Sequence, residues 1–282
     1  HTGTPYAEGR GAYRDLFISD NAVTSEVMFA VATDKTLGMG QANWWYNSST
    51  YGPHLCMSRK FMNTYLNQDG TPYSDKHADG TYKTFVEDCT GRDLRFNQTV
   101  RGADYTRKDA NGAYERTPAN FQGHTLTGYQ FTKWVMDDVA YDDGENNDND
   151  EPLMRYAEVL LNYAEAQAEL GQLTDSEWAE TIGALRARAG ITGGTDQTGT
   201  LTSKPHAVEP YIAAYYPGVS NPVVLEVRRE REIELALEGL RLNDLKRWNA
   251  CDLWVNDPWQ GVFIPALNTP LDMNGDGTDD VY

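Results

Sequence analysis

With 282 residues, the chain is long enough to bury a substantial core, either as one large domain or as two smaller ones. Its formal net charge of −18 at pH 7 argues against nucleic acid and anionic lipid as partners, because both are bound through a surplus of Lys and Arg. A neutral ligand is not repelled by such a surface.

Residues 1–141 are rich in Gly, Asn, Asp and Tyr and contain only short apolar runs. This composition predicts short helices joined by long loops, so ligand-facing side chains are expected on irregular segments held by a scaffold. Residues 23–33 are expected to form a strand or a short helix. Residues 58–66 are expected to form a helix with Ser58 as its N-cap.

The aromatic segment N-W-W-Y-N-S-S-T-Y supplies the candidate ligand-binding residues Asn43, Trp44, Trp45, Tyr46 and Tyr51. An aromatic ring covers the apolar face of a sugar while Asn or Asp side chains bond its hydroxyls, and the area buried is worth roughly 25 cal/mol per Å². Adjacent side chains of an extended segment point to opposite faces, so we expect one of the two tryptophans, with one of the tyrosines, to face a ligand. The alternative is that at least one tryptophan fills the core.

Residues 142–282 are expected to form a helical region. A polar linker at 142–151 leads to Pro152, a residue typical of the first helical position, and Gly171 is the expected end of that helix. Thr174 and Glu177 form a capping-box pattern for a second helix that ends near Gly190. Two antiparallel helices over roughly 37 residues match the size of a tetratricopeptide unit, whose period is about 34 residues.

Residues 230–248 predict one long helix, with Asn221 and Pro222 opening the segment that leads into it. Ile233 and Leu237 are four residues apart and contribute to one apolar face. Gly239 sits inside the predicted helix at a cost of about 1 kcal/mol, which usually means that another backbone comes close. The tail after this helix is rich in Pro and Asp and is expected to pack as coil.

The opposite face of this segment alternates acids with arginines. The charged residues are Glu230, Arg231, Glu234, Glu238, Arg241, Asp244 and Arg247. Hydrolysis of a glycosidic bond needs carboxylates placed across a cleft, about 5–9.5 Å apart. Acids that alternate with arginines along one helix favour a network of ion pairs between packed helices instead, so we interpret this face as scaffold, with catalysis as the alternative.

A C-terminal run of Asp, Asn and Gly is a candidate calcium loop. Asp272, Asn274, Asp276 and Asp280 match positions 1, 3, 5 and 9 of such a loop, and Gly277 matches position 6. The acid of position 12 would fall past the last residue. The alternative is a hydrogen-bonded turn without metal.

Several kinds of site lack support in the sequence. Cys56, Cys89 and Cys251 are widely spaced and odd in number, so we expect buried, reduced thiols, with one bridge as the alternative. No zinc-protease, serine-hydrolase or P-loop motif occurs, and no apolar run is long enough to span a membrane.

Four segments in order resemble the SusD/RagB family of surface glycan-binding lipoproteins from Bacteroidetes-type bacteria. They are E-R-x-x-E-L-x-x-E-G-x-R-x-x-D-L-x-R-W at 230–248, R-Y-A-E-V-L-L-N-Y-A-E-A within 154–171, R-D-L-R-F at 92–96, and T-G-Y at 127–129 followed by Lys133. Leu94 stands where the family usually has Pro. These elements are mostly scaffold, so they point to the family more strongly than to a ligand.

The resemblance implies a mostly α fold, in which tetratricopeptide-like helices support an irregular, loop-rich lobe. It also implies non-catalytic capture of an oligosaccharide or polysaccharide at the cell outer membrane, for import through a SusC-like TonB-dependent transporter. The alternatives are an assembly component of the transporter complex without its own ligand, or a glycoside hydrolase. Family members carry a signal peptide, a lipid anchor and a helical N-terminal half, none of which precedes these segments here, so we expect the sequence to begin part-way through such a protein.

Overall fold

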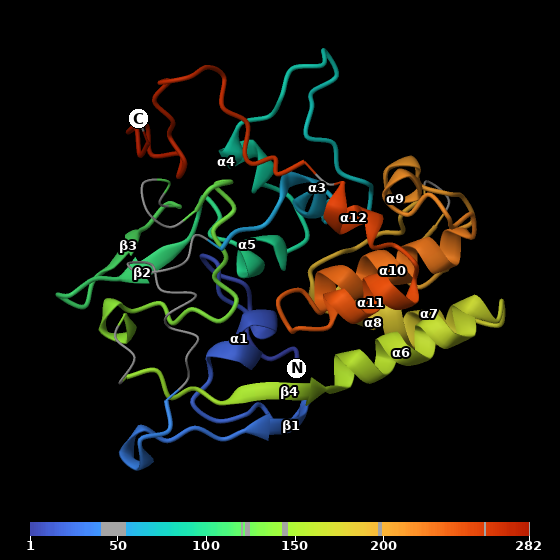
Figure 1. The fold of residues 1–282 in the computed structure, drawn as a ribbon, viewed down its shortest axis with the longest axis horizontal. Helices are drawn as coiled ribbons and strands as arrows, with labels where there is room; N and C mark the ends of the chain where they lie inside the picture. The colour runs from blue at the N-terminus through green and yellow to red at the C-terminus, as the bar shows by residue number, and fades with distance from the viewer. Residues whose placement is uncertain are drawn as a thin grey trace.

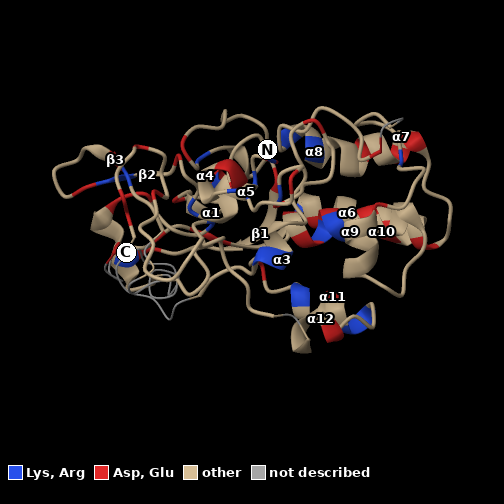
Figure 2. Ribbon diagram, turned by 90° about the horizontal axis from the view of Figure 1, so that it is seen from above, with Lys and Arg blue, Asp and Glu red and all other residues tan. Residues whose placement is uncertain are grey.

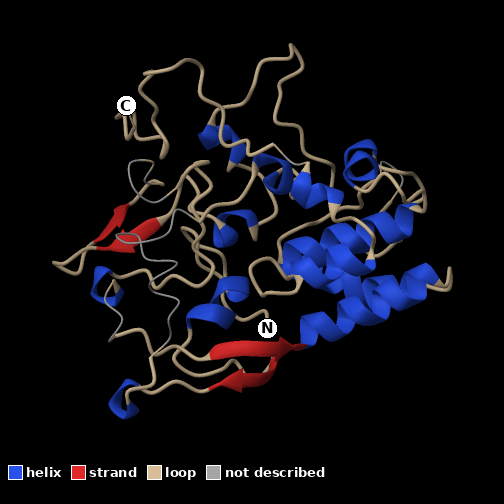
Figure 3. Ribbon diagram, viewed as in Figure 1, coloured by secondary structure: helices blue, strands red, loops and turns tan. Residues whose placement is uncertain are grey.

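The longer helices gather on one side of the molecule, and loops with short helical segments make up the other side (Figure 3). The computed structural model describes residues 1–40, 55–119, 121, 125–142, 146–196, 199–256 and 258–281. The α-helices are α1 (Ala12–Ile18), α3 (Arg59–Met62), α4 (Phe85–Asp88), α5 (Phe96–Thr99), α6 (Tyr156–Glu169), α7 (Asp175–Trp178), α8 (Ala184–Arg188), α9 (Pro210–Tyr215), α10 (Pro222–Glu234), α11 (Arg241–Arg247) and α12 (Asp252–Val255). Two short 3₁₀ turns, η1 (Lys35–Leu37) and η2 (Val139–Tyr141), and a π-helical turn, η3 (Ala179–Gly183), complete the helical elements described.

Two small antiparallel sheets lie on the loop-rich side and along its border with the helices (Figure 1). Strand β2 (Thr106–Lys108) pairs with β3 (Tyr114–Arg116) as a hairpin. Strand β1 (Val27–Val31) pairs with β4 (Glu151–Arg155), which leads directly into α6. Residues 23–33 therefore contribute a strand. The β1–β4 pairing crosses the expected division between residues 1–141 and 142–282, which stays a prediction.

The first long helix begins later than the sequence predicts. Pro152 lies in β4 opposite Ala30 of β1, and α6 begins only at Tyr156. Because the sheet has just two strands, a proline in it does not break a ladder on both sides, so the strand tolerates it. The prediction that Pro152 opens a helix is wrong.

The end of α6 and the start of the next helical run follow the predicted signals. Gly171 adopts a positive φ of 67° just after the helix, and Thr174 and Glu177 form a reciprocal capping box ahead of α7. The run continues through η3 into α8 and stops at Arg188, close to Gly190 with φ 76°. The tetratricopeptide-like character of this pair stays a prediction.

The segment 230–248 is not one helix. Asn221 caps α10 and Pro222 occupies its first turn, as predicted, but α10 ends at Glu234 and α11 begins at Arg241. Between them Leu237 and Gly239 have positive φ values of 65° and 79°. Among the described residues beyond its two chain neighbours, no atom lies within 4 Å of the place where a Cβ on Gly239 would sit, so this glycine serves a left-handed turn and not a close backbone approach.

Helix α10 is buried along nearly its whole length although most of its residues are charged (Figure 2). The Glu234 carboxylate accepts hydrogen bonds from Arg155 at 2.6 Å and from Arg95 at 2.7 Å, and a further one from Arg188. Arg95 also reaches Glu230 at 2.6 Å. Burial alone would raise the pKa of Glu234, but Arg188, Arg155 and Arg95 hold it well below its usual range. Arg95 directly precedes α5, and Arg155 is the last residue of β4. The network therefore joins α10 to segments outside the group of longer helices.

The exposure of the cysteines and the structure of the C-terminal tail differ in part from what the sequence predicts. All three thiols are free, and Cys89 is buried, but Cys56 is half-buried and Cys251 is exposed, so the expectation of buried thiols is wrong for Cys251. The tail expected to be coil carries α12, followed by loops closed by a bridge between Leu271 and Val281. No helix in the described part of the chain has both the length and the apolar character needed to cross a bilayer.

Candidate functional site

The aromatic residues first considered for ligand binding, Asn43, Trp44, Trp45, Tyr46 and Tyr51, lie outside the described residues. Their role therefore stays a prediction. A different group of aromatic side chains forms a hollow at the edge of the helical side.

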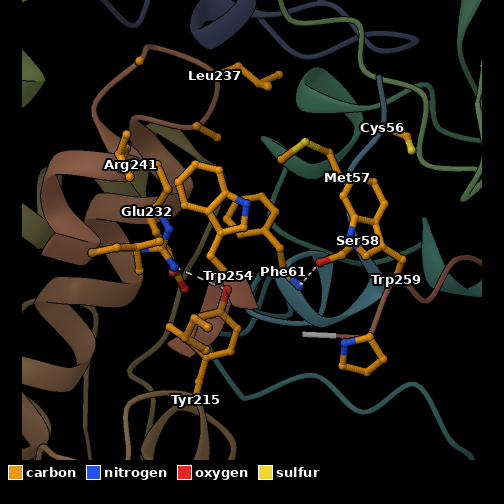
Figure 4. A pocket seen from close by; sticks show the side chains of 16 residues that line it. Cys56, Met57, Ser58, Phe61, Tyr215, Glu232, Leu237, Arg241, Trp254 and Trp259 are labelled. Carbon is orange, nitrogen blue, oxygen red and sulfur yellow. Dashed lines mark hydrogen bonds and ion pairs between the residues drawn. The ribbon is translucent and has the colours of Figure 1, made fainter. Parts of the chain in front are cut away.

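This hollow, which we name the tryptophan pocket, has a volume of about 490 Å³. It lies where α3, the C-terminal end of α9, the α10–α11 turn and α12 meet (Figure 1). Its aromatic lining consists of Phe61, Tyr215, Trp254 and Trp259. In Figure 4 the Phe61 ring is seen behind the indole of Trp254, and the indole of Trp259 lies to their right. The two indoles are 60% and 74% exposed, whereas the core tryptophans Trp134, Trp178 and Trp248 are at most 9% exposed.

Arg59 fixes the chain segment that carries Trp259 against α3. The backbone N–H of Arg59 donates to the Gln260 carbonyl at 2.8 Å, and its Nε donates to the Gly261 carbonyl at 2.6 Å. Ser58 caps α3 by accepting a hydrogen bond from the Phe61 N–H at 3.3 Å, as the sequence predicts. The helix is shorter than expected, because it ends at Met62. Two sides of the pocket are thus held together by hydrogen bonds to backbone.

The α10–α11 turn forms another wall of the pocket. The Lys133 ammonium group donates to the Ala236 carbonyl at 2.6 Å and to Glu238 Oε1 at 2.6 Å. The Trp134 indole N–H donates to the Leu237 carbonyl at 3.2 Å. These bonds hold a turn in which Leu237 has a left-handed backbone conformation. A residue other than glycine adopts this conformation only at a cost in free energy.

The pocket is also lined by an ion pair between the buried Glu232 and the half-buried Arg241. Arg241 lies 2.8 Å from Glu232 Oε2, and the Tyr216 hydroxyl donates to the same oxygen. Burial raises the pKa of Glu232, with Arg241 acting against it. The second carboxylate oxygen of Glu232, Oε1, is buried, so it does not reach the open part of the pocket. The pocket therefore offers open aromatic faces beside an ion pair that is engaged within the protein, an arrangement suited to a ligand with apolar faces.

The sequence-based reasoning missed Trp254 and Trp259. The signal was present as W-V-N-D-P-W, two tryptophans in a polar, proline-containing tail. In such a tail a tryptophan is more readily exposed than in a long apolar run, because there is little neighbouring core to cover it.

The family model of the SusD family matches residues 20–275. The chain belongs to the SusD family. A solved SusD-like carbohydrate binding protein from Bacteroides fragilis NCTC 9343 is similar with a TM-score of 0.54 and 23% identity, over 88% of this chain and 46% of that one. A SusD-like protein from the same strain is similar with a TM-score of 0.56 and 22% identity, over 88% of this chain and 49% of that one. No curated protein matches the sequence.

The chain spans about half the length of these two SusD-like structures. At these identities the likeness shows the shared fold, which confirms the helix-rich, SusD-like architecture that the sequence predicts.

The charged face of the SusD-family signature segment forms ion pairs in the structure. Asp244 lies 2.8 Å from both Arg231 and Arg247, and Glu238 lies 2.7 Å from Arg155. Every acid of this face in the described residues is held by a cation, which supports its interpretation as scaffold. Arg241 pairs with Glu232 of α10, which lies before the break between the two helices.

The C-terminal loop of this SusD-family chain is closed by its own hydrogen bonds. The Asp272 carboxylate accepts from the backbone N–H groups of Gly275 at 2.6 Å and Gly277 at 2.8 Å. Asp280 accepts from the Met273 N–H at 2.8 Å and from the Asn274 amide at 3.2 Å. Among the described residues no group of three or more His, Cys, Asp or Glu side chains is arranged to hold a metal ion. Calcium binding here stays a prediction.

Proposed function

We propose that this protein captures oligosaccharide or polysaccharide at the bacterial cell surface and leaves the glycosidic bonds intact. Membership of the SusD family supports this proposal, and one of the similar solved structures is a carbohydrate binding protein. The glycan would then pass into a SusC-like TonB-dependent transporter, and the protein would be a lipoprotein of the outer membrane.

The observation that carries the proposal is the exposure of Trp254 and Trp259 inside one hollow. Two large aromatic faces left open to water are costly unless a ligand covers them. A sugar ring stacked on an indole buries apolar area worth roughly 25 cal/mol per Å². Affinity is expected to be modest, because the sugar hydroxyls must first lose their water.

The charges around the tryptophan pocket favour binding over hydrolysis. A glycoside hydrolase needs two carboxylates about 5–9.5 Å apart across the scissile bond. Within the described residues, Glu232 is the single carboxylate that lines the pocket, and Arg241 pairs with it. Among the described residues that line the pocket, no second acid faces Glu232 to act as general acid or nucleophile.

Two groups of aromatic residues compete as the glycan site. One is the tryptophan pocket, and the other is the segment that contains Trp44 and Trp45. Affinity electrophoresis across a panel of neutral polysaccharides separates them when wild type is compared with Trp254→Ala, Trp259→Ala, Trp44→Ala and Trp45→Ala. Tyr114→Ala, which removes an exposed ring on β3, is the matched control.

We expect at least one polysaccharide to retard the wild type and the Tyr114 variant, and retardation to fall when Trp254 or Trp259 is replaced. Loss of retardation in the Trp44 or Trp45 variants alone would move the site to that segment. No retardation by any polysaccharide would favour an assembly role without a ligand. Release of shorter sugars during incubation would favour a glycoside hydrolase.

A further inference from the structure

A second hollow of about 500 Å³ lies beside the tryptophan pocket, on the other side of α12. We name it the asparagine pocket. Its lining includes Tyr215, Tyr216, Trp248, Asn249, Asp252 and Asn256. Tyr215 and Leu253 line both hollows, so the two share a wall.

The aromatic residues of the asparagine pocket form a fixed, apolar base. The rings of Tyr216 and Trp248 meet edge to face, with centroids 5.7 Å apart, and Tyr215 packs against Tyr216 at 5.0 Å. The Trp248 indole N–H donates to Glu165 at 2.6 Å, which holds the ring in place. All three rings are buried, so they shape the hollow and do not offer open faces for stacking.

The rim of the asparagine pocket carries exposed polar side chains that can hydrogen-bond to a ligand. Asn249, Asp252 and Asn256 are exposed, and their side chains form no hydrogen bond or ion pair with any other described residue. Asn221, in contrast, uses its side chain to cap α10. An amide offers both donors and acceptors, which matches the hydroxyl groups of a sugar. Asn249 has a left-handed φ of 53°, so its amide is presented from a turn of defined geometry.

The two hollows offer different kinds of contact to a carbohydrate: aromatic stacking in one and hydrogen bonding in the other. The tryptophan pocket offers open aromatic faces, whereas its ion pair Glu232–Arg241 is largely engaged within the protein. The asparagine pocket offers free amide and carboxylate groups over a closed aromatic base. A single sugar unit in either hollow would meet only one kind of contact.

We propose that the asparagine pocket is a second subsite for the same ligand, and that the ligand is an oligosaccharide chain that crosses from one hollow to the other past Tyr215 and Leu253. This inference rests on the proposed glycan binding at the tryptophan pocket. It assigns chain-length selectivity to Asn249 and Asn256, which bond hydroxyl groups of sugar units beyond those stacked on Trp254 and Trp259.

The test is calorimetric titration with a ladder of oligosaccharides, from monosaccharide to hexasaccharide, made by partial hydrolysis of the polysaccharide that most retards the wild type. The variant combines Asn249→Gly, which keeps the left-handed turn, with Asn256→Ala. Asn243→Ala, on the exposed side of α11 and outside both hollows, is the matched control. Circular dichroism and melting temperature check that each variant is folded.

We expect wild-type affinity to rise with oligosaccharide length, and the Asn249/Asn256 variant to lose about tenfold in affinity for the longer members only. Trp254→Ala should weaken binding of every member, and Asn243→Ala should change nothing. Unchanged affinity of the double variant at all lengths would overturn the second subsite while leaving the tryptophan pocket in place. Equal weakening at all lengths would overturn it as well. Full binding by Trp254→Ala and Trp259→Ala would instead remove the proposed site itself.

Discussion

The Lys133 ammonium group lies 2.6 Å from the carbonyl oxygen of Ala236, in the turn that forms one wall of the tryptophan pocket. Lys133 follows the T-G-Y segment, far from the turn in sequence, and is fully buried. The same ammonium group donates to Glu238 and to the Tyr13 hydroxyl at 2.7 Å. One buried cation thus links the loop-rich lobe to the shape of the pocket.

Replacing Lys133 with Met should change how stability depends on pH. Burial lowers the pKa of Lys133 from 10.5 to about 8, although Glu238 acts against this. Between about pH 8 and 10.5 the unfolded chain keeps a proton that the folded chain has lost, so this group makes the free energy of unfolding rise with pH. Lys133→Met should lack that contribution.

The measurement for Lys133 is urea unfolding of wild type and variant at intervals from about pH 7.5 to 9, where most unfolded tyrosines keep their protons. Lys246→Met, at an exposed position on α11, serves as control and should follow the wild type. Parallel curves for wild type and Lys133→Met would contradict the prediction. Besides burial, the charges that act on the pKa of Lys133 are Glu238 and Glu234, which raise it, and Arg155, which lowers it.

Glu234→Gln should destabilise the protein strongly at neutral pH. Removing one side of a buried ion pair leaves its partners uncompensated, which costs about 3–5 kcal/mol, and Glu234 contacts Arg95, Arg155 and Arg188. Its folded-state pKa is lowered well below 4.5, so its contribution is full above pH 4.5 and is lost as the pH falls towards the folded value.

Urea unfolding at pH 7 and at pH 4 measures both effects. Part of the difference between wild type and Glu234→Gln should disappear at the lower pH. Glu169→Gln is the matched control, because Glu169 pairs with Arg228 at 3.1 Å but is 49% exposed, and such a pair is worth about 0–1 kcal/mol. A Glu234 variant as stable as the control would show that the network does not depend on this carboxylate.

Gly239→Ala should cost about 1–2 kcal/mol, because φ at this position is 79° and an L side chain is strained in the left-handed region. Nothing lies within 4 Å of the added Cβ, so no clash contributes. Gly218→Ala also meets open space and has no positive φ, so its effect should stay within about 0.5 kcal/mol. Chemical unfolding of the two variants compares them directly, and equal stabilities would argue against strain at Gly239.

If the loop at 272–280 binds calcium as its spacing predicts, the melting temperature should be higher in calcium than in EDTA. An ion at one hundred times its Kd adds about 2.7 kcal/mol to the free energy of unfolding. Asp276→Asn removes a predicted ligand and should abolish the shift, whereas Asp279→Asn, outside the predicted positions, should keep it. Identical melting with and without calcium would assign the loop to the self-bonded turn.

Local signals in the sequence predicted helix ends better than helix continuity. Ser58, Thr174 and Asn221 cap helices in the structure, because a cap needs only a side-chain oxygen and the N–H groups next to it. The break between Glu234 and Arg241 was not predicted, because the apolar spacing continues through it. Buried contacts from Lys133 and Trp134, distant in sequence, hold that turn.

The candidate site was harder to predict than the fold. The signature residues form the ion-paired scaffold and can be recognised by their order in the chain. Trp254 and Trp259 form a pocket only because α12 lies beside α3 and α9 in the fold. The spacing of residues within 250–260 does not predict that arrangement.

Cys251 immediately precedes α12, the helix that separates the two hollows. Its thiol is exposed, while burial raises the pKa of the Cys89 thiol and leaves that residue unreactive. In a Cys56→Ser background, a maleimide fluorophore would therefore attach next to both pockets. The native sequence thus provides a place for an optical reporter of sugar occupancy.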